Sequence, residues 1–258
     1  MNYKEVFAAL EKYAPLKLSD ELVKAENGYD NSGIILANDG EIKNIAFALD
    51  LTVGAVEFAK EKNCNLIVTH HPAIYRPVKS FGENSPLRLA AKNNMAIISM
   101  HLNLDCAEKG IDYYLAEGLG GKVIKISEPL GKNEGYGRLS AVGGITTEQL
   151  SEKYKNTFNT DKVWVYGDKD RKITKIASFC GAGLDENAVN FAVENGAEVV
   201  VSADIPHHVL LSALENGLCV LACTHYDTEI YGFEKFFRFA AERFKNENIY
   251  FYRDERLS

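Results

Sequence analysis

Two stretches of the chain match each other without a gap at an offset of 133 residues: AVEFAKEKNCNLIVTHH at 55–71 and AVNFAVENGAEVVVSAD at 188–204. Each has the pattern of a helix, a turn and a buried strand, because apolar residues recur at helical spacing before a short apolar run. A second match, at an offset of 124, pairs AIISMHLNLD from Ala96 with VLACTHYDTE from Val220. Self-similarity of this extent predicts two related α/β halves.

Short apolar runs alternate with helical patterns along most of the chain, which is typical of α/β proteins with parallel strands. We therefore expect two related, intertwined α/β halves with mixed, largely parallel sheets. The first half is expected at 1–125 and 225–258, and the second at 126–224. The predicted strands lie at 44–51, 66–69, 96–100, 138–143, 176–180, 198–202, 218–223 and 248–253, with helices at 147–158 and about 228–245.

The composition excludes some classes of protein. No run approaches the roughly 18 apolar residues that span a bilayer, and the N-terminus lacks the pattern of a signal peptide. The net charge of -7 disfavours nucleic acid as a partner, since a phosphate backbone repels an acidic chain. Five cysteines, an odd number, lie mostly in or beside apolar runs, which favours a reducing compartment and a cytoplasmic location. A redox role for Cys219 and Cys223 has little support, because four residues along a strand separate them too far for a disulfide.

All of the histidines follow predicted strands, at the edge of an α/β sheet where ligands bind. They are His70 and His71 after LIVT, His101 after AIISM, His207 and His208 after VVVSADIP, and His225 after VLACT.

Several of these histidines occur in patterns suited to metal binding. His70 and His71 precede a proline, and two adjacent imidazoles point in different directions, so they can serve two ions. His101 and His225 each precede an acid by four residues, Asp105 and Glu229, which places imidazole and carboxylate on one side of a helix. Carboxylates can bridge two cations about 3.5–4 Å apart. The pattern predicts a site for two metal ions.

Structural interpretations compete with this one. A single histidine is most often solvated or hydrogen-bonded, and Asp105 could stabilise a helix N-terminus. Asp50 is expected to cap the helix that starts near Thr52. His207 and His208 are expected to be structural or to lie next to the ligands without binding the metal. Glycine turns at 143–144 and 181–183 could admit a phosphate but are more often plain turns, and the cationic side chains of Arg76 and Lys79 could contact an anionic substrate.

Three segments in order carry a family resemblance: IVTHHPAIYRPVKSF from Ile67, SMHLNLDCAEKGIDYYLAEGLG from Ser99 and ACTHYDTE from Ala222. With the opening YDNSGI at 29–34, they resemble the Nif-three-like dinuclear metal-centre proteins, often named GTP cyclohydrolase 1 type 2 homologues. The resemblance covers nearly the whole chain and is to the short form without an inserted domain. The segment SADIPHHV from Ser202 departs from the family pattern.

The resemblance implies a metal-ligand set consisting of His70, His71, Asp105, His225 and Glu229. It implies that His101 lies next to the ligands, where it could shuttle protons. It also implies a toroidal homohexamer, a trimer of dimers, with the metal sites facing an internal cavity.

Two functions are compatible with such a site. The first is a metal-dependent hydrolase that acts on a nucleotide-like substrate such as GTP, using two divalent ions to activate water. The second is a non-catalytic hexameric scaffold or regulator that the metals stabilise. Imidazole and carboxylate ligands without thiolate suit zinc, iron, manganese or nickel.

Overall fold

The computed structural model describes residues 1–245 and 247–257, and the chain forms two compact units. The first contains Met1–Ala107 and Phe233–Ser258, and the second contains Glu108–Gly232. Both are α/β, as the sequence predicts. The chain leaves the first unit after Ala107 and returns to it at Phe233, within helix α10 (His225–Arg243). The boundary predicted after residue 125 falls within strand β5 (Lys122–Pro129) of the second unit.

The first unit is built on a five-stranded sheet with the order β1-β4-β3-β2-β11. The edge strand β1 runs antiparallel to β4, and the other neighbours are parallel. The strands are β1 (Gly33–Leu36), β2 (Asn44–Ala48), β3 (Leu66–Thr69), β4 (Ala96–Ser99) and β11 (Asn248–Tyr252). The helices are α1 (Tyr3–Leu10), α2 (Leu16–Glu26), α3 (Val53–Glu61), α4 (Pro86–Lys92), α5 (Leu102–Asp105) and the part of α10 after Gly232.

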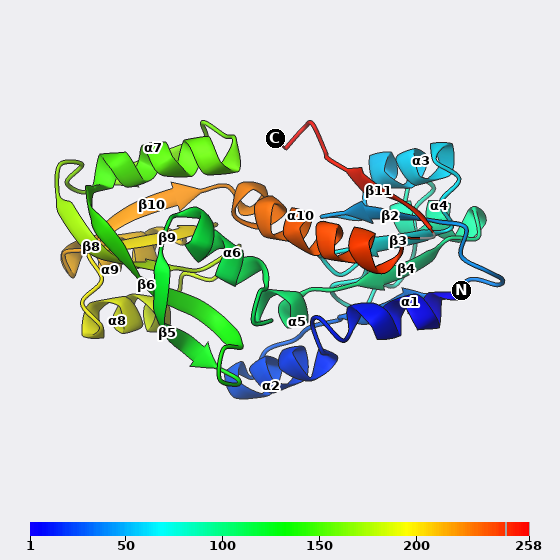
Figure 1. Ribbon diagram of the computed structural model, residues 1–258, viewed down its shortest axis with the longest axis horizontal. Helices are drawn as coiled ribbons and strands as arrows, with labels where there is room; N and C mark the ends of the chain where they lie inside the picture. Colours follow the sequence, from blue (N-terminus) through cyan, green and yellow to red (C-terminus); the bar gives the residue numbers. More distant parts are fainter. Residues whose placement is uncertain (246, 258) are drawn as a thin grey trace. The chain divides into compact units, whose positions relative to one another are not determined.

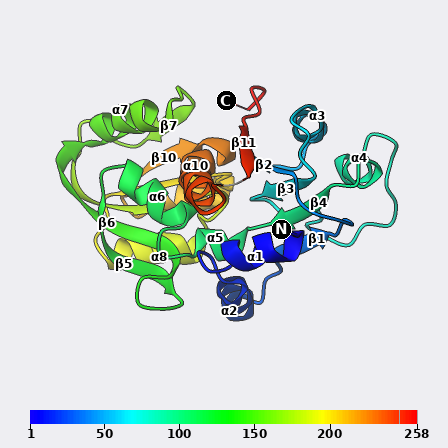
Figure 2. The same ribbon diagram turned by 45° about the vertical axis from the view of Figure 1, so that its right-hand side comes forward.

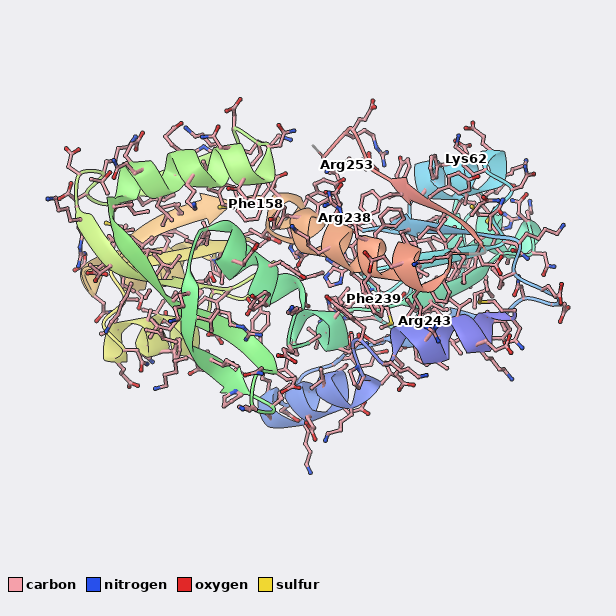
Figure 3. The ribbon with its side chains drawn as sticks, viewed as in Figure 1. Lys62, Phe158, Arg238, Phe239, Arg243 and Arg253 are labelled. Carbon is pink, nitrogen blue, oxygen red and sulfur yellow. The ribbon has the colours of Figure 1, made fainter. Side chains whose placement is uncertain are left out.

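Helices cover both faces of this sheet because successive residues of its strands point to opposite sides. Ala46 and Ile67 belong to a core shared with α3 and α4, and Figure 2 shows these two helices beside the strands. On the other face, the Phe47 ring lies 6.1 Å from that of Phe236 in α10. Phe239 of α10, labelled in Figure 3, extends this aromatic layer.

The second unit has a six-stranded sheet with the order β5-β6-β8-β9-β10-β7. Its centre, β8-β9-β10, is parallel, and the remaining neighbours are antiparallel. The expected mixture of strand directions is confirmed, and the parallel share is larger in the first sheet. The further strands are β6 (Gly135–Thr146), β7 (Val163–Tyr166), β8 (Lys172–Ser178), β9 (Val199–Ala203) and β10 (Cys219–Cys223).

The helices of the second unit also lie on both faces of its sheet, as Figure 1 shows for α7 on one side and α8 and α9 on the other. Val200 and Val220 pack into a core with Val189 of α8 and Val209 of α9. The helices are α6 (Ile111–Gly118), α7 (Thr147–Phe158), α8 (Glu186–Glu194) and α9 (His207–Glu215).

The sequence repeat is a structural repeat. When 133 is added to the residue numbers of α3, they become the residue numbers of α8, and the first residue of β3 becomes the first residue of β9. The turn after each helix contains a residue with positive φ: Asn63 after α3, at 54°, and its equivalent Gly196 after α8, at 70°. In both sheets the repeated strand lies parallel between two others, β2-β3-β4 and β8-β9-β10.

The helices are amphipathic and several begin with side-chain caps. Asn2 and Thr146 start α1 and α7 with capping boxes, in which Glu5 and Gln149 return the hydrogen bond. Within residues 1–245 and 247–257, no helix has the length and apolarity needed to cross a bilayer.

Candidate metal centre

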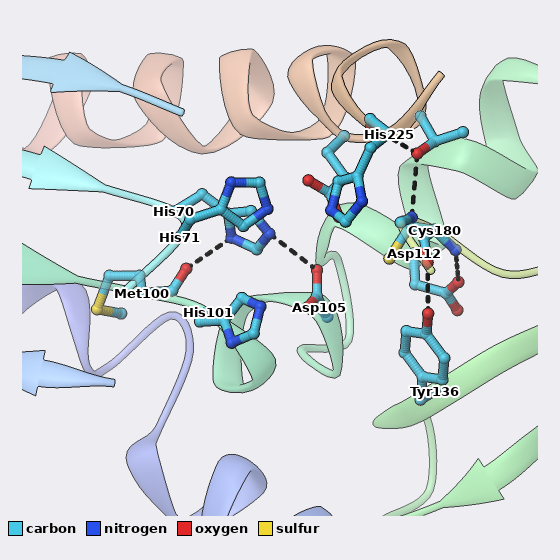
Figure 4. A network of polar contacts seen from close by, with 12 residues as sticks. His70, His71, Met100, His101, Asp105, Asp112, Tyr136, Cys180 and His225 are labelled. Atoms are coloured by element: carbon cyan, nitrogen blue, oxygen red, sulfur yellow. Dashed lines mark hydrogen bonds and ion pairs between the residues drawn. The ribbon is translucent and has the colours of Figure 1, made fainter. Parts of the chain in front are cut away.

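Three histidines of the first unit lie together at the carboxyl ends of two neighbouring strands. His70 and His71 follow β3, and His101 follows β4 after one intervening residue. Because Thr69 is paired with Ser99 in the parallel register, both strands end at the same edge of the sheet. The three side chains offer nitrogen atoms within 4.8 Å of one another, and Figure 4 shows their rings gathered at this edge.

Asp105 joins this histidine cluster from α5, which starts immediately after His101. Its Oδ1 lies 3.5 Å from His70 Nε2, and its side chain is 5% exposed. Asp105 is the last residue of this four-residue helix and also lies in its first turn, whereas the N-cap position belongs to His101. Asp105 is thus not the N-cap of α5, and its carboxylate faces the His70 imidazole.

The Nδ1 atom of each clustered histidine is engaged by an oxygen atom. The pairs are His70 with the Met100 carbonyl at 2.8 Å, His71 with Asp50 Oδ1 at 2.7 Å and His101 with Asp30 Oδ1 at 2.7 Å. A carbonyl oxygen only accepts, so Nδ1 of His70 donates and its Nε2 carries the lone pair. Oxygen partners on one imidazole nitrogen are the usual support for a histidine that binds metal through the other.

Asp50 has a different role from the one that the sequence suggested. Thr52 is the N-cap of α3, since its hydroxyl accepts a hydrogen bond from the Ala55 N–H. Asp50 lies before this cap and holds the His71 ring. The expectation that Asp50 caps α3 is wrong, because Thr52, the residue directly before the helix, is the cap.

Asp30 was not singled out by sequence, although it lies in the YDNSG segment. Its Oδ2 accepts hydrogen bonds from the hydroxyls of Ser19, at 2.5 Å, and Ser32, at 2.6 Å. Burial raises the pKa of this carboxyl, but the contacts with His101 and the two hydroxyls outweigh burial and lower the pKa below its ordinary value. Asp30 is thus an ionised partner for His101.

The second unit contains the other pair of predicted ligands, His225 and Glu229, one turn apart on α10. His225 Nε2 lies 3.1 Å from Glu229 Oε1, and the carboxylate is 3% exposed. His225 Nδ1 contacts Asp204 Oδ2 at 2.6 Å, which repeats the support seen in the histidine cluster. The helix begins at His225, three residues before the predicted start near Thr228, so both ligands share one helical face.

The Gly181 turn packs against this α10 pair. Gly181 has a φ of +54°, and a Cβ there would overlap Glu229 Oε1 and come within 3.0 Å of His225 Nε2. The Gly181 N–H donates to the Thr228 hydroxyl at 3.0 Å. Because this donor is used within the fold, the turn is poorly suited to the phosphate contact that its glycines suggested.

The buried ion pair between Asp112 and Arg138 contacts the residue before the Gly181 turn. Asp112 Oδ1 accepts a hydrogen bond from the Cys180 N–H at 3.2 Å, and Oδ2 lies 3.4 Å from Arg138 Nη1. The Tyr136 hydroxyl donates to the Cys180 carbonyl at 2.5 Å, as Figure 4 shows. Burial raises the pKa of Asp112 to about 6, although the Arg138 charge acts in the opposite direction.

The remaining candidates lie outside these two groups. His207 and His208 are exposed on the first turn of α9. Arg76 and Lys79 are exposed in the loop between β3 and α4. The five cysteines form no disulfide with one another, and burial raises the pKa of Cys223 to about 12, which leaves little thiolate for redox chemistry.

The fold and its two ligand groups define an α/β protein with imidazole and carboxylate clusters suited to divalent cations. The chain belongs to the Duf34/NIF3 (NGG1p interacting factor 3) family, whose model matches residues 1–256. This confirms the resemblance found in the sequence.

Individual relatives agree with the family assignment. The chain is 30% identical over 253 residues to a GTP cyclohydrolase 1 type 2 homolog of Methanocaldococcus jannaschii, covering 96% of this chain and 98% of the relative. It is 28% identical over 226 residues to the protein NIF3 homolog of Schizosaccharomyces pombe, covering 80% and 79%.

Solved structures share the fold. A Bacillus cereus protein related to NIF3 has a TM-score of 0.85 at 19% identity and covers 99% of this chain and 97% of its own. The reduced form of HcgD from Methanocaldococcus jannaschii has a TM-score of 0.79 at 28% identity, with 97% of both chains covered.

Proposed function

We propose that the histidine cluster and the α10 pair together form one dinuclear metal centre, and that the protein is a metal-dependent hydrolase. The proposed ligands are His70, His71, Asp105, His225 and Glu229. The observation that carries the proposal is the oxygen contact on Nδ1 of each histidine in this set, which is the usual support for a histidine that binds metal through Nε2.

The donor chemistry fits divalent cations. Asp105 and Glu229 are both buried, and buried carboxylates are costly unless positive charge compensates them. Nitrogen and carboxylate donors without thiolate suit zinc, iron, manganese or nickel, and the geometry of the five side chains does not select among them.

When bound, two such ions acidify water near neutral pH and polarise a substrate oxygen. The residues of the chain supply binding and orientation. Asp50 and Asp204 fix the rings of His71 and His225, and the Met100 carbonyl fixes His70. Asp30 holds His101 at the rim of the cluster, where its ring is 15% exposed to solvent.

The substrate class is proposed from the relatives. Several of them are named GTP cyclohydrolase 1 type 2 homologs, which favours a nucleotide-like substrate. Arg76 and Lys79, both exposed on the loop after His71, are candidates for its phosphates.

The test is turnover of GTP and other nucleotides by protein loaded with zinc, iron, manganese or nickel. We expect turnover in the wild type and in His207→Ala, which changes an exposed histidine outside both groups, and a loss of at least about a hundredfold in Glu229→Gln. Absence of turnover with every metal, in protein that binds two ions, would reject the hydrolase and favour a metal-stabilised scaffold or regulator.

The homohexamer implied by the family resemblance stays a prediction. Light scattering on purified protein measures it directly, and a mass of six chains is the expected result. A monomer at micromolar concentration would contradict the expected assembly.

A further inference from the structure

The histidine cluster of the first unit contains a possible cation site that needs no residue from the second. We propose that His70, His71 and His101 bind one divalent cation through their Nε2 atoms, and that this three-histidine site is where the first ion is captured. The inference rests on the proposed function only in sharing His70 and His71 with the dinuclear centre. It makes His101 a metal ligand of the captured state.

The spacing of the rings fits one shared ion. Three imidazoles that bind an ion through Nε2 at about 2.1 Å, at tetrahedral angles, have ring centroids about 5 Å apart. The measured centroid separations are 4.7 Å for His70–His71, 5.2 Å for His70–His101 and 5.7 Å for His71–His101. The rings are also mutually inclined at 46°, 54° and 65° rather than stacked, as side chains converging on a point would be.

His101 is supported in the same way as the histidines in the predicted ligand set. Its Nδ1 lies 2.7 Å from Asp30 Oδ1, and Ser19 and Ser32 hold the other oxygen of that carboxylate. The Ser32 hydroxyl also accepts a hydrogen bond from the His101 N–H at 3.1 Å. A ring fixed through both its backbone and its Nδ1 loses little freedom when Nε2 binds an ion.

The site is accessible from solvent on one side. The His70 side chain is fully buried, whereas those of His71 and His101 are 23% and 15% exposed. Three protein ligands leave a fourth position for water or for the Asp105 carboxylate, which lies 3.5 Å from His70 Nε2.

Three neutral imidazoles select a class of ion. They suit zinc, nickel, iron and cobalt, and they disfavour magnesium and calcium, which prefer oxygen ligands.

The experiment removes the α10 pair and asks whether one ion remains. The full chain carrying His225→Ala and Glu229→Gln is titrated with Co²⁺, whose visible absorption is intense in tetrahedral and weak in octahedral surroundings. We expect one Co²⁺ per chain with the intense spectrum. Adding His101→Ala should weaken binding by roughly a hundredfold or more, since losing an outer partner alone costs about 10–100-fold. Adding His207→Ala is the matched control and should change nothing.

The outcomes separate this inference from the proposed function. Wild-type protein that binds two ions while the double variant binds none would overturn the three-histidine site and leave the dinuclear centre standing. Retention of the ion after His101→Ala would overturn it as well. If His101→Ala does not fold, Asp30→Asn is the second variant, with an expected loss of about 10–100-fold, and unchanged affinity there would contradict the role of His101.

Discussion

At the scale of single residues, the oxygen contact on the Nδ1 atom of each histidine supports metal binding through Nε2. Asp50, Asp30 and Asp204 each hold an Nδ1 atom, within 2.6–2.7 Å. Such partners fix the tautomer and the direction of Nε2, so they affect metal affinity without touching the metal.

Asp50→Asn tests this role against that of a helix cap. An amide in place of the carboxylate weakens its hold on His71, and we expect metal affinity to fall by about 10–100-fold with little loss of stability. Thr52→Ala is the matched control: it removes the cap of α3 and should cost about 1 kcal/mol of unfolding free energy while metal affinity stays the same. Isothermal titration and urea unfolding measure the two effects, and a reversed pattern would restore the capping interpretation.

Asp112 gives a pH-dependent signature in the second unit. Its pKa rises from an ordinary value of 3.8 to about 6 in the fold, so the folded state keeps a proton that the unfolded chain releases. The unfolding free energy of wild type, relative to Asp112→Asn, should therefore fall as the pH rises through this window, by a few kcal/mol at most. The expected trend is a relative loss of stability between about pH 4 and about pH 7 in urea unfolding. A difference that does not vary with pH would mean that Arg138 fully compensates the buried charge.

The five proposed ligands were predicted from the sequence, and the oxygen partners of the three histidines among them were not. His70, His71 and His225 stand out because they follow strands, and strand ends are visible in the apolar pattern. Asp50 and Asp30 are recognisable only once the strands β1 to β4 lie side by side, because their contacts join residues that are 21 and 71 positions apart in the chain. One feature of the sequence pointed to Asp204: in the repeat it is the equivalent of His71, at the end of the equivalent strand.

At the scale of elements, the repeat explains how well the strands and helices could be predicted. Helix α7 matches its predicted range of 147–158, and β3 matches 66–69. The helix after β10 was predicted about three residues late because the polar run THYDTE lacks an apolar stripe. Thr224 supplies the start signal, as its hydroxyl accepts the Asp227 N–H at 3.1 Å.

The Gly181 turn is the element on which the α10 pair depends. In Gly181→Ala, the added Cβ would displace Glu229 and His225, so we expect metal binding to weaken by on the order of tenfold or more. Gly217→Ala is the matched control, because Gly217 also has positive φ, 75°, but no atom near its missing Cβ. Both variants should lose about 1 kcal/mol of stability for the backbone conformation, and only Gly181→Ala should lose metal affinity. Equal affinities in the two variants would show that the turn does not position the ligands.

At the scale of the whole molecule, the chain divides so that three of the proposed ligands belong to one unit and two to the other. An ion that takes ligands from both units stabilises the folded chain by mass action, by about 2.7 kcal/mol at a free concentration 100 times its dissociation constant. We expect removal of metal with a chelator to lower the melting temperature by several degrees, and excess zinc to restore it. In Asp105→Ala/Glu229→Ala, which keeps His70, His71 and His101, the chelator should lower the melting temperature less than in the wild type. A wild type whose melting temperature ignores both chelator and metal would speak against a bridging site.

The most direct test of the dinuclear centre is the metal content of protein purified without added metal, measured by elemental analysis beside the Asp105→Ala/Glu229→Ala variant. The account predicts close to two ions per chain in the wild type and at most one in the variant, held by His70, His71 and His101, with the fold retained by circular dichroism. Wild-type protein without metal that also fails to take up added zinc, iron, manganese or nickel would contradict it.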